Sequence, residues 1–362
     1  MGLAFGGQCH YNRIASSKPN SNLKEKCIME PMKILIAMVD NPTSATFLTE
    51  KNMEKLNKLG TVIWDKSVEK ITPDWLRDNL VDIDICVCCW GVPKFDAYVL
   101  EKANKLKFIG YLAGSVANVT SDEMYDRGIR ISCGNEMFAQ SVAECTVAYM
   151  LYAQRDLRKY NNITTAGGWK ESAFTCQALI EKEVGIVGYG AISRYLLEML
   201  KPFHCNIKLY SRHTTEEQAA AMGVQKASLE EIFSTCDIVS IHQSKTVENH
   251  HLVNDELLSM MPQGALLVNT ARGDVVDEEA LAKHLHAGHI RAALDVYQKE
   301  PPAADSPLRG TDNIYMFPHI GGPTIDRRPA CARVVFEDIE RLQKGEELQN
   351  EIKAWRSKMM TH

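Results

Sequence analysis

The sequence lacks a long apolar run, a strong excess of one charge, and any internal repeat. No apolar stretch reaches the roughly 18 residues that a membrane-spanning helix needs. The formal net charge is −5, from 41 Lys and Arg against 46 Asp and Glu, and the signs are mixed along the chain. Such a balance gives no electrostatic reason to expect nucleic acid or an anionic membrane as a partner.

Cysteine is present, but not in a pattern typical of metal sites or secreted scaffolds. The chain has 11 cysteines and no apolar signal-peptide core. Cys86, Cys88 and Cys89 lie in a stretch that is typical of a buried strand, where alternation puts the first two on one face and Cys89 on the other. We interpret them as small core residues rather than metal ligands. Reduced thiols, no metal and a cytoplasmic location are expected.

Residues 1–31 differ from the rest of the chain. They are polar, rich in Ser, Asn and Lys, and have no clear period, so a disordered N-terminal extension is predicted. Gly6 stands where a myristoylation motif needs Ser or Thr, which makes that match poor. The periodic pattern begins at Met32.

From Lys33 the pattern alternates between strand and helix, which predicts an α/β fold with parallel sheets. The 362-residue length leaves room for two domains of about 150 residues each. Two Rossmann-like or flavodoxin-like domains are predicted, with the NAD(P)-binding domain, 137–322, inserted in a substrate-binding (catalytic) domain of 32–136 and 323–362. The predicted strands are Lys33–Met38, Thr61–Asp65, Ile85–Trp90, Phe108–Leu112, Arg130–Cys133, the strand from Val184 to the glycine turn, Ile207–Tyr210, Ile238–His242, Ala265–Asn269, Ala292–Leu294 and Ile314–Phe317. Helical patterns cover Thr49–Leu59, Pro73–Leu80, Ala139–Asp156 and the stretch from Arg328.

The most informative stretch, Val184–Arg194, reads V-G-I-V-G-Y-G-A-I-S-R. An apolar strand runs into Gly-x-Gly and a helical pattern follows, as in a dinucleotide-binding βαβ unit. Gly188 permits the tight turn, and Gly190 lets the backbone approach a pyrophosphate at the helix N-terminus. Ser193 replaces the third glycine, which is expected to loosen helix packing without removing the phosphate site. The predicted cofactor-binding residues here are Gly188, Tyr189, Gly190, Ala191 and Ile192.

The second strand of this unit ends without the carboxylate that would bind the ribose diol of NAD. Ser211 takes the acidic position and Arg212 follows it. Arginine forms paired, charge-assisted hydrogen bonds to phosphate, so the pattern favours NADP(H) and leaves NAD(H) open. The alternative interpretation is that Arg212 is a solvated loop residue.

Ionisable residues stand at the ends of three predicted strands in the second half of the chain. Arg272 follows one, Asp295 ends the next with Glu300 five residues on, and His319 ends the last. Each alone has an ordinary alternative as a surface residue. Behind a nucleotide fingerprint they supply what hydride transfer needs: a cation for a carboxylate, an imidazole for the proton, and a carboxylate that keeps the imidazole oriented.

Over residues 33–352, the chain resembles the D-isomer-specific 2-hydroxyacid dehydrogenase family. The resemblance is carried by ordered matches at Leu106–Tyr111, Gly128–Ile131, Ser141–Glu144, Val184–Ser193, Asp237–His242, Asn269–Gly273, Leu294–Val296, Glu300–Pro301 and Pro318–Gly321. It implies that Arg272 anchors the substrate carboxylate and carbonyl, that Glu300 and His319 form the acid/base pair, and that Asp295 holds the nicotinamide carboxamide.

The resemblance also implies further binding residues. Those of the substrate are Ala113, Gly114 and Ser115 of a glycine-containing loop, with Trp90 capping or narrowing the pocket; those of the cofactor are His242, Thr270, Ala271 and Gly321. It predicts an NAD(P)H-dependent reductase of small 2-oxo acids, similar to glyoxylate/hydroxypyruvate reductases, that runs in reverse as a D-2-hydroxyacid dehydrogenase and assembles as a homodimer. Two rivals remain: a nucleotide-sensing corepressor or scaffold on the same fold, and a related dehydrogenase with a non-carboxylate donor.

Overall fold

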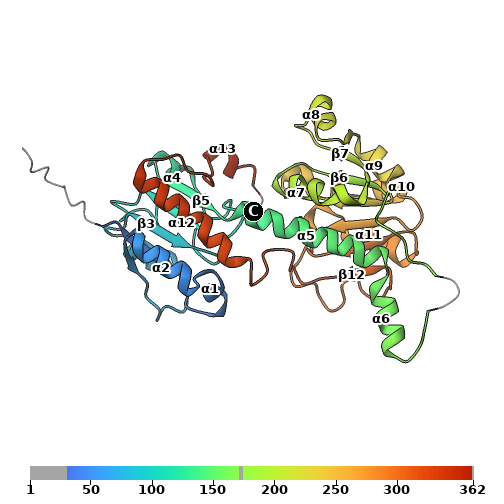
Figure 1. Ribbon diagram of the computed structural model, residues 1–362, viewed down its shortest axis with the longest axis horizontal. Helices are drawn as coiled ribbons and strands as arrows, with labels where there is room; N and C mark the ends of the chain where they lie inside the picture. Colours follow the sequence, from blue (N-terminus) through green and yellow to red (C-terminus); the bar gives the residue numbers. More distant parts are fainter. Residues whose placement is uncertain (1–30, 171–173, 361–362) are drawn as a thin grey trace, which may run out of the picture. The chain divides into compact units, whose positions relative to one another are not determined.

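The structure is a computed structural model that describes residues 31–170 and 174–360. From Met32 onward the described residues form one compact unit built on two parallel β-sheets (Figure 1). The predicted disordered extension falls on residues 1–31, which lie outside the described residues apart from Pro31. Among the helices that the structure describes, none has the length and apolar character to cross a membrane.

The first sheet has five parallel strands in the order β2-β1-β3-β4-β5. Its inner strands are buried almost throughout, which explains their continuous apolar runs rather than an alternating pattern. The strand order reverses between β1 and β3, and ligands of open α/β sheets bind at such points. The strands are β1 (Lys33–Ala37), β2 (Thr61–Ile63), β3 (Ile85–Cys88), β4 (Phe108–Tyr111) and β5 (Arg130–Cys133).

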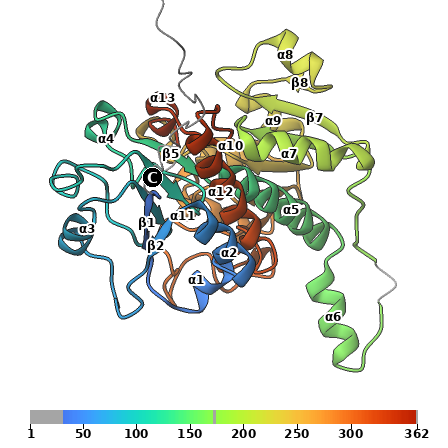
Figure 2. The same ribbon diagram turned by 60° about the vertical axis from the view of Figure 1, so that its left-hand side comes forward.

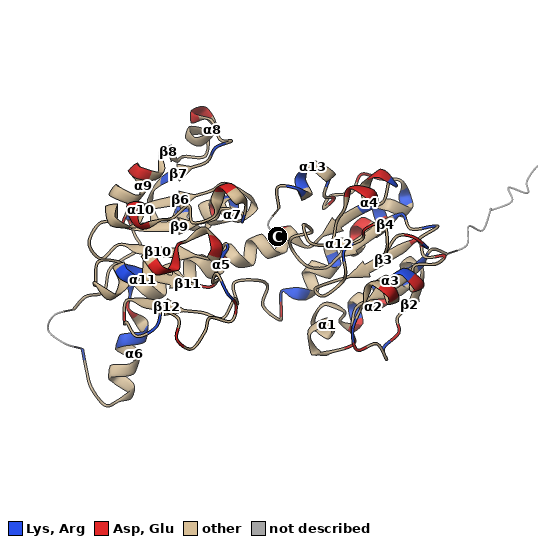
Figure 3. Cartoon of the chain, turned by 180° about the vertical axis from the view of Figure 1, so that it is seen from behind, with Lys and Arg blue, Asp and Glu red and all other residues tan. Residues whose placement is uncertain are grey.

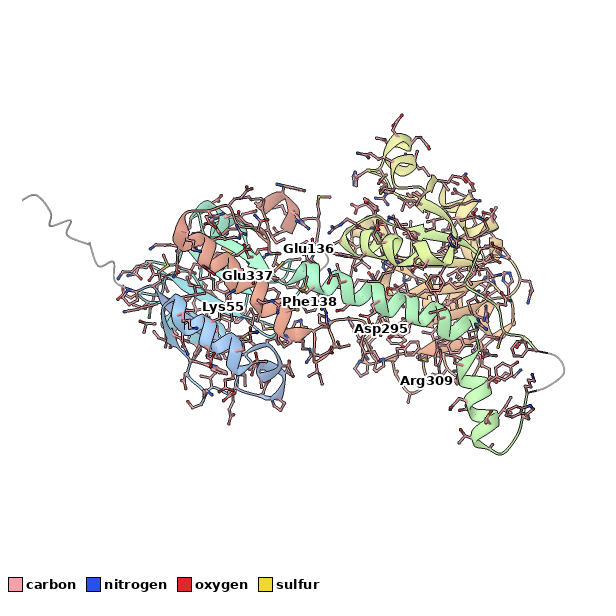
Figure 4. All side chains as sticks on the ribbon, viewed as in Figure 1. Lys55, Glu136, Phe138, Asp295, Arg309 and Glu337 are labelled. Atoms are coloured by element: carbon pink, nitrogen blue, oxygen red, sulfur yellow. The ribbon has the colours of Figure 1, made fainter. Side chains whose placement is uncertain are left out.

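A helix from the C-terminal part of the chain packs on this first sheet. Helix α12 contacts β4 and β5 and lies beside α1 and α2 (Figure 2). Its Asp338 is fully buried and accepts a hydrogen bond from Ser132 Oγ of β5 at 2.7 Å, and its Glu337 pairs with Lys55 of α2 (Figure 4). The helices around this sheet are α1 (Pro42–Phe47), α2 (Glu50–Leu59), α3 (Pro73–Asn79), α4 (Asp122–Asp126), α12 (Arg328–Lys344) and α13 (Ala354–Ser357).

The second sheet has seven parallel strands in the order β12-β11-β10-β9-β6-β7-β8. The chain starts at β6, winds outward to β7 and β8, and then returns to β9 on the other side of β6. This reversal puts the ends of β6 and β9 at a topological switch point. The strands are β6 (Glu183–Val187), β7 (Asn206–Tyr210), β8 (Gln225–Lys226), β9 (Ile238–Ile241), β10 (Leu266–Asn269), β11 (Arg291–Leu294) and β12 (Ile314–Met316).

Helices cover both faces of the second sheet, as its two apolar clusters require. Helix α5 packs against α7, β10 and β11. On the face seen in Figure 3, acidic and basic segments are interspersed over these helices. The helices are α5 (Asn135–Gln154), α6 (Leu157–Thr165), α7 (Ala191–Leu200), α8 (Glu216–Ala221), α9 (Leu229–Thr235), α10 (Asp255–Met260) and α11 (Glu278–His286), with short 3-10 turns η1 (Lys201–Phe203), η2 (Val247–Asn249) and η3 (Gly273–Val275).

The predicted α/β fold with parallel sheets is confirmed. Every predicted strand is present, with ends that differ by at most two residues, whereas the short edge strand β8 is not signalled by the sequence. Helix α5 begins at Asn135, four residues before the predicted start at Ala139. The helix starts early because Gly134 turns the chain directly from β5 into it, with the Gly134 N–H donating to two carbonyls of the β4 end.

Candidate active site

The glycine turn after β6 has the geometry that a pyrophosphate needs. Gly188 has a φ of +105°, and a Cβ there would stand 2.8 Å from the His242 carbonyl oxygen, so only glycine fits. A Cβ on Gly190 would meet nothing within 4 Å, which leaves open space beside the turn. No side chain caps the ten-residue helix α7, so the first-turn N–H groups of Ala191 and Ile192 face that space. The residues present therefore fit a dinucleotide phosphate.

Ser193, which replaces the third glycine, closes this turn rather than loosening it. Its side chain is fully buried, and its Oγ donates to the Gly188 carbonyl at 2.8 Å. The expected loosening of the helix packing is therefore wrong, because the hydroxyl finds an acceptor inside the turn. Tyr189, between the two glycines, is 40% exposed and free to lie against a bound molecule.

At the end of β7, the position expected to recognise the ribose has no carboxylate. Ser211 is buried and its Oγ accepts a hydrogen bond from Thr214 Oγ1 at 2.8 Å. Arg212 is exposed, and its Nη2 donates to Asn249 Oδ1 at 2.9 Å. Asn249 in turn donates to the Ser244 carbonyl. The guanidinium is thus oriented by one bond and retains further N–H donors for an anion.

His242 and Thr270 follow β9 and β10 at the same edge of the sheet. His242 Nε2 lies 2.8 Å from Ser240 Oγ, while Nδ1 is buried and has no hydrogen-bond partner among the described residues. Burial lowers the pKa of His242 to about 4, so the ring is neutral at ordinary pH. Thr270 is buried and shares a hydrogen bond with Thr146 Oγ1 of α5 at 2.9 Å.

The turn that carries Arg272 is built by Asn269 at the end of β10. Asn269 accepts from Ala271 N at 3.0 Å and donates to the Arg272 carbonyl at 2.9 Å. Arg272 Nη1 donates to the Ala271 carbonyl, which turns the side chain back along the loop. Burial lowers the pKa of Arg272 and the Glu300 carboxylate opposes that shift. The guanidinium stays cationic, since arginine is not deprotonated in proteins.

Asp295 ends β11 and organises the loop that holds His319. Its carboxylate is 2% exposed and accepts three hydrogen bonds: from Tyr149 O–H, Ile320 N and Gly321 N. A Cβ on Gly321 would stand 2.8 Å from Asp295 Oδ2, so a larger residue would push the carboxylate away. Figure 4 labels Asp295 beside α5, the helix that supplies Tyr149. Asp295 therefore stabilises the loop that follows His319.

The structure brings His319 and Glu300 into direct contact. His319 Nδ1 lies 2.7 Å from Glu300 Oε2, and Glu300 Oε1 accepts a hydrogen bond from Tyr297 N at 3.1 Å. The His319 side chain is 49% exposed, and its backbone has a φ of +54°. Because Nδ1 faces the carboxylate, Nε2 is the ring atom left to meet a substrate.

Apart from Arg272, the residues predicted to bind substrate follow strands of the first sheet. Ala113 and Gly114 are buried after β4, and Ser115 Oγ accepts from Ala117 N at 3.4 Å. A Cβ on Gly114 would meet the Phe138 ring at 3.1 Å. Phe138 stands near the start of α5 (Figure 4) and also lies within 4 Å of where a Gly322 Cβ would be, so its ring reaches both loops.

Trp90, after β3, belongs to an aromatic cluster with Phe138. The Trp90 ring makes edge contacts with Phe47 at 5.5 Å and with Phe138 at 5.8 Å between ring centroids. The Arg328 guanidinium lies 5.5 Å from the Trp90 centroid. Trp90 is still 49% exposed, so it is available to a ligand. In the described part of the chain, no group of three or more His, Cys, Asp or Glu side chains is arranged to hold a metal ion.

Comparison with known proteins shows which family this chain matches. Residues 147–321 match the model of the D-isomer specific 2-hydroxyacid dehydrogenase family, NAD binding domain. The chain is 33% identical over 282 residues to the D-3-phosphoglycerate dehydrogenase of Methanocaldococcus jannaschii, covering 77% of this chain and 53% of that protein. It is 33% identical over 289 residues to the glyoxylate reductase of Thermofilum pendens, covering 78% of this chain and 84% of that protein.

A solved structure agrees with these matches: a Thermus thermophilus protein superimposes with a TM-score of 0.74 at 27% identity, over 89% of this chain and 100% of that one. The chain spans about half the length of the phosphoglycerate dehydrogenases that it matches. Fold, nucleotide turn and ordered sequence matches define a nucleotide-dependent dehydrogenase scaffold. The chain belongs to the D-isomer specific 2-hydroxyacid dehydrogenase family.

Sequence reasoning missed several residues that shape the site. Tyr149 is the partner of Asp295, and it lies on one face of α5 with Cys145, four residues earlier, and Ser141, eight residues earlier. That spacing is visible in the sequence, but the stretch is apolar and is typical of a core helix. Phe138 gave no signal at all, because an aromatic residue near a helix start has no fixed partner until the loops are folded.

Proposed function

We propose that this protein is an NADPH-dependent reductase of small 2-oxo acids, reversible as a D-2-hydroxyacid dehydrogenase. The observation that carries the proposal is the contact between His319 Nδ1 and Glu300 Oε2 at 2.7 Å, beside the turn of Arg272. An imidazole held by a carboxylate, next to a half-buried guanidinium, can transfer a proton to a carbonyl that the guanidinium anchors. The family supports the same reaction class.

Each of the three residues has a defined part in this proposal. Arg272 binds the substrate carboxylate and polarises the keto oxygen, with backbone N–H groups of Gly114 and Ser115 on the other side. When bound, the nicotinamide supplies the hydride that adds to the keto carbon. His319 donates a proton from Nε2 to the developing alkoxide, and Glu300 keeps the imidazole oriented through Nδ1.

The preference for NADP(H) is the finer part of the cofactor proposal. It is supported by the missing carboxylate at Ser211 and by the Arg212 guanidinium, which Asn249 orients at 2.9 Å. A carboxylate at Ser211 would repel a 2′-phosphate, whereas a guanidinium binds one with paired hydrogen bonds. His242, Thr270, Ala271 and Gly321 are proposed to line the cofactor site, since they all follow the carboxyl ends of strands in one sheet.

Residues 32–136 and 323–362 are proposed as the substrate-binding domain, and 137–322 as the NAD(P)-binding domain. The packing of α12 on β4 and β5 supports this division. Trp90 and Phe138 would narrow the substrate pocket, which favours a short 2-oxo acid. Two relatives that this chain covers over most of their length are glyoxylate reductases, so glyoxylate is the first substrate to test.

A homodimer is proposed as the assembly. Helix α6 has no buried residue, and the segment around it exposes large apolar side chains, which in a monomer would face water. Trp169 is 74% exposed, Phe174 59% and Ile180 55%. Sedimentation of the wild-type chain and of Trp169→Asp at several concentrations measures the assembly; two monomeric species would contradict a dimer through this segment.

The experiment that tests the reaction is NADPH oxidation with a panel of 2-oxo acids, glyoxylate first, by wild type and His319→Gln. Loss of a positioned acid/base group lowers the rate by about 10²–10⁴-fold, while NADPH binding, followed by fluorescence, stays unchanged. His286→Gln is the matched control, since that imidazole lies at hydrogen-bond distance from the Pro307 carbonyl, outside the site. Tight NADPH binding without turnover of any acid would instead favour a nucleotide-sensing scaffold.

A further inference from the structure

The peptide between Tyr297 and Gln298 lies where the anchor and the acid/base pair meet. On one side is Gly273, directly after Arg272: a Cβ built there would stand 1.8 Å from the Tyr297 carbonyl carbon and 2.3 Å from Gln298 N. On the other side, the N–H of Tyr297, which belongs to the preceding peptide, donates to Glu300 Oε1 at 3.1 Å. Tyr297 therefore connects the Arg272 turn with the Glu300 carboxylate.

Glu278, the first residue of α11, holds this peptide from a third direction. Its Oε1 accepts a hydrogen bond from Gln298 N at 2.6 Å. The side chain of Gln298 is fixed as well, since its Nε2 donates to the Val276 carbonyl at 3.0 Å and lies 2.5 Å from His251 Nε2. The Tyr297–Gln298 peptide is thus clamped between Gly273 and the Glu278 carboxylate.

A carboxylate at this place has an electrostatic cost. Glu278 is half-buried, and burial raises its pKa, with a further contribution from the neighbouring Glu300 carboxylate. Two nearby negative charges oppose each other, so a neutral residue would avoid this repulsion. What the carboxylate supplies in return is a short, charge-assisted hydrogen bond to Gln298 N, stronger than a neutral acceptor would give. Glu279, the next residue, is exposed and makes no such contact.

We propose that Glu278 is a positioning residue for the reaction: by clamping the Tyr297–Gln298 peptide against Gly273, it keeps Arg272 and Glu300 at the spacing that catalysis needs. The inference rests on the proposed function of this site. Glu278 acts through the loop backbone and touches neither substrate nor cofactor. Misplacing catalytic groups by about 1 Å costs up to roughly a hundredfold in rate.

The test compares Glu278→Ala, Glu278→Gln and Glu279→Ala in NADPH-dependent reduction of glyoxylate. Glu278→Ala removes a hydrogen bond to a charged acceptor, so kcat falls by at least about tenfold. Glu278→Gln recovers most of that loss, because its amide oxygen still accepts from Gln298 N. Glu279→Ala removes the same charge from the same helical turn and leaves kcat unchanged. In Glu278→Ala the dissociation constant of NADPH changes by less than kcat does, since the Gly188 turn follows a different strand, and it is unchanged in Glu279→Ala.

Hydrogen exchange at the Gln298 amide gives a readout that needs no turnover. The amide is protected in wild type, Glu278→Gln and Glu279→Ala, and exchanges faster in Glu278→Ala. If wild type reduces no 2-oxo acid, the proposed function fails while this measurement still decides whether the clamp exists. Equal protection in Glu278→Ala and wild type would overturn the inference. An unchanged kcat in Glu278→Ala would also overturn it. A fall in kcat that Glu278→Gln fails to restore, with matching falls in NADPH affinity and Tm, would overturn it as well.

Discussion

Replacing Tyr149 by Phe removes one of the three donors that hold the buried Asp295 carboxylate. The Tyr149 hydroxyl donates to Asp295 Oδ1 at 2.9 Å, and both side chains are buried. A hydrogen bond to a charged group contributes about 1.5–3 kcal/mol. The Phe ring keeps the stacking on Phe317, whose centroid is 3.9 Å away, so the loss is confined to the hydroxyl. At about 2–4 °C per kcal/mol for a domain of this size, we expect Tm to fall by about 3–12 °C.

The matched control is Tyr152→Phe, one turn further along α5. Tyr152 packs edge-on against Phe317 and Tyr315, and its hydroxyl donates no hydrogen bond within the described residues. Urea and thermal unfolding of both variants measure the difference in stability, and glyoxylate reduction measures the effect on the loop that Asp295 holds. Equal stability of Tyr149→Phe and Tyr152→Phe would refute the assignment of Tyr149 as a necessary donor to Asp295.

Other predictions follow from the site. Arg272→Lys keeps the charge but loses the two-pronged geometry, so KM rises and kcat falls together; a kinetically silent variant would move the anchor elsewhere. Glu300→Gln removes the carboxylate that lies 2.7 Å from His319 Nδ1, so kcat falls; a kinetically silent variant would count against the pair. Ser211→Asp with Arg212→Ala reverses a preference of at least about tenfold for NADPH over NADH; equal use of both by wild type would show the preference to be wrong. Burial lowers the pKa of folded His242 to about 4, so protonation of this residue favours unfolding. The free energy of unfolding is unaffected by His242 above about pH 6.5 and falls by up to about 3 kcal/mol as the pH drops toward 4. Urea unfolding of wild type and His242→Gln across this range checks the sign, and parallel curves would contradict it.

Much of the fold was predictable because it rests on local pattern. The strand from Lys33 and the strand before Gly188 are short apolar runs followed by turn residues, and such runs are buried wherever parallel sheets form. The ends of strands were harder. Hydrogen bonding to a neighbour decides where a strand stops, so Ile85–Cys88 ends two residues before the apolar run does. The edge strand β8 has no apolar signal, because Gln225 and Lys226 pair with one strand only.

The candidate site divides in the same way. Arg272 and His319 were predictable from chain position, since the carboxyl ends of parallel strands share one edge and polar residues there meet a common ligand. The residues that hold them were not. In the sequence, Asp295 resembles any other carboxylate at the end of a strand. The structure shows that it accepts hydrogen bonds from Tyr149, almost 150 positions away, and from the loop after His319. Which donors converge on a carboxylate depends on tertiary packing, which no spacing in the sequence records.

The residues that mark the family therefore differ from those that distinguish this chain within it. The glycine turn and the His319–Glu300 contact lie in stretches that match the family, so their presence supports a reaction class. Trp90 contacts Phe47, Phe138 and Arg328, and Phe138 reaches Gly114. In the proposed reaction Arg272 would anchor one end of the substrate, and aromatic rings with one guanidinium would discriminate by size and charge at its other end. Under the proposed function, we expect this cluster to select among 2-oxo acids by the size and charge of their far ends.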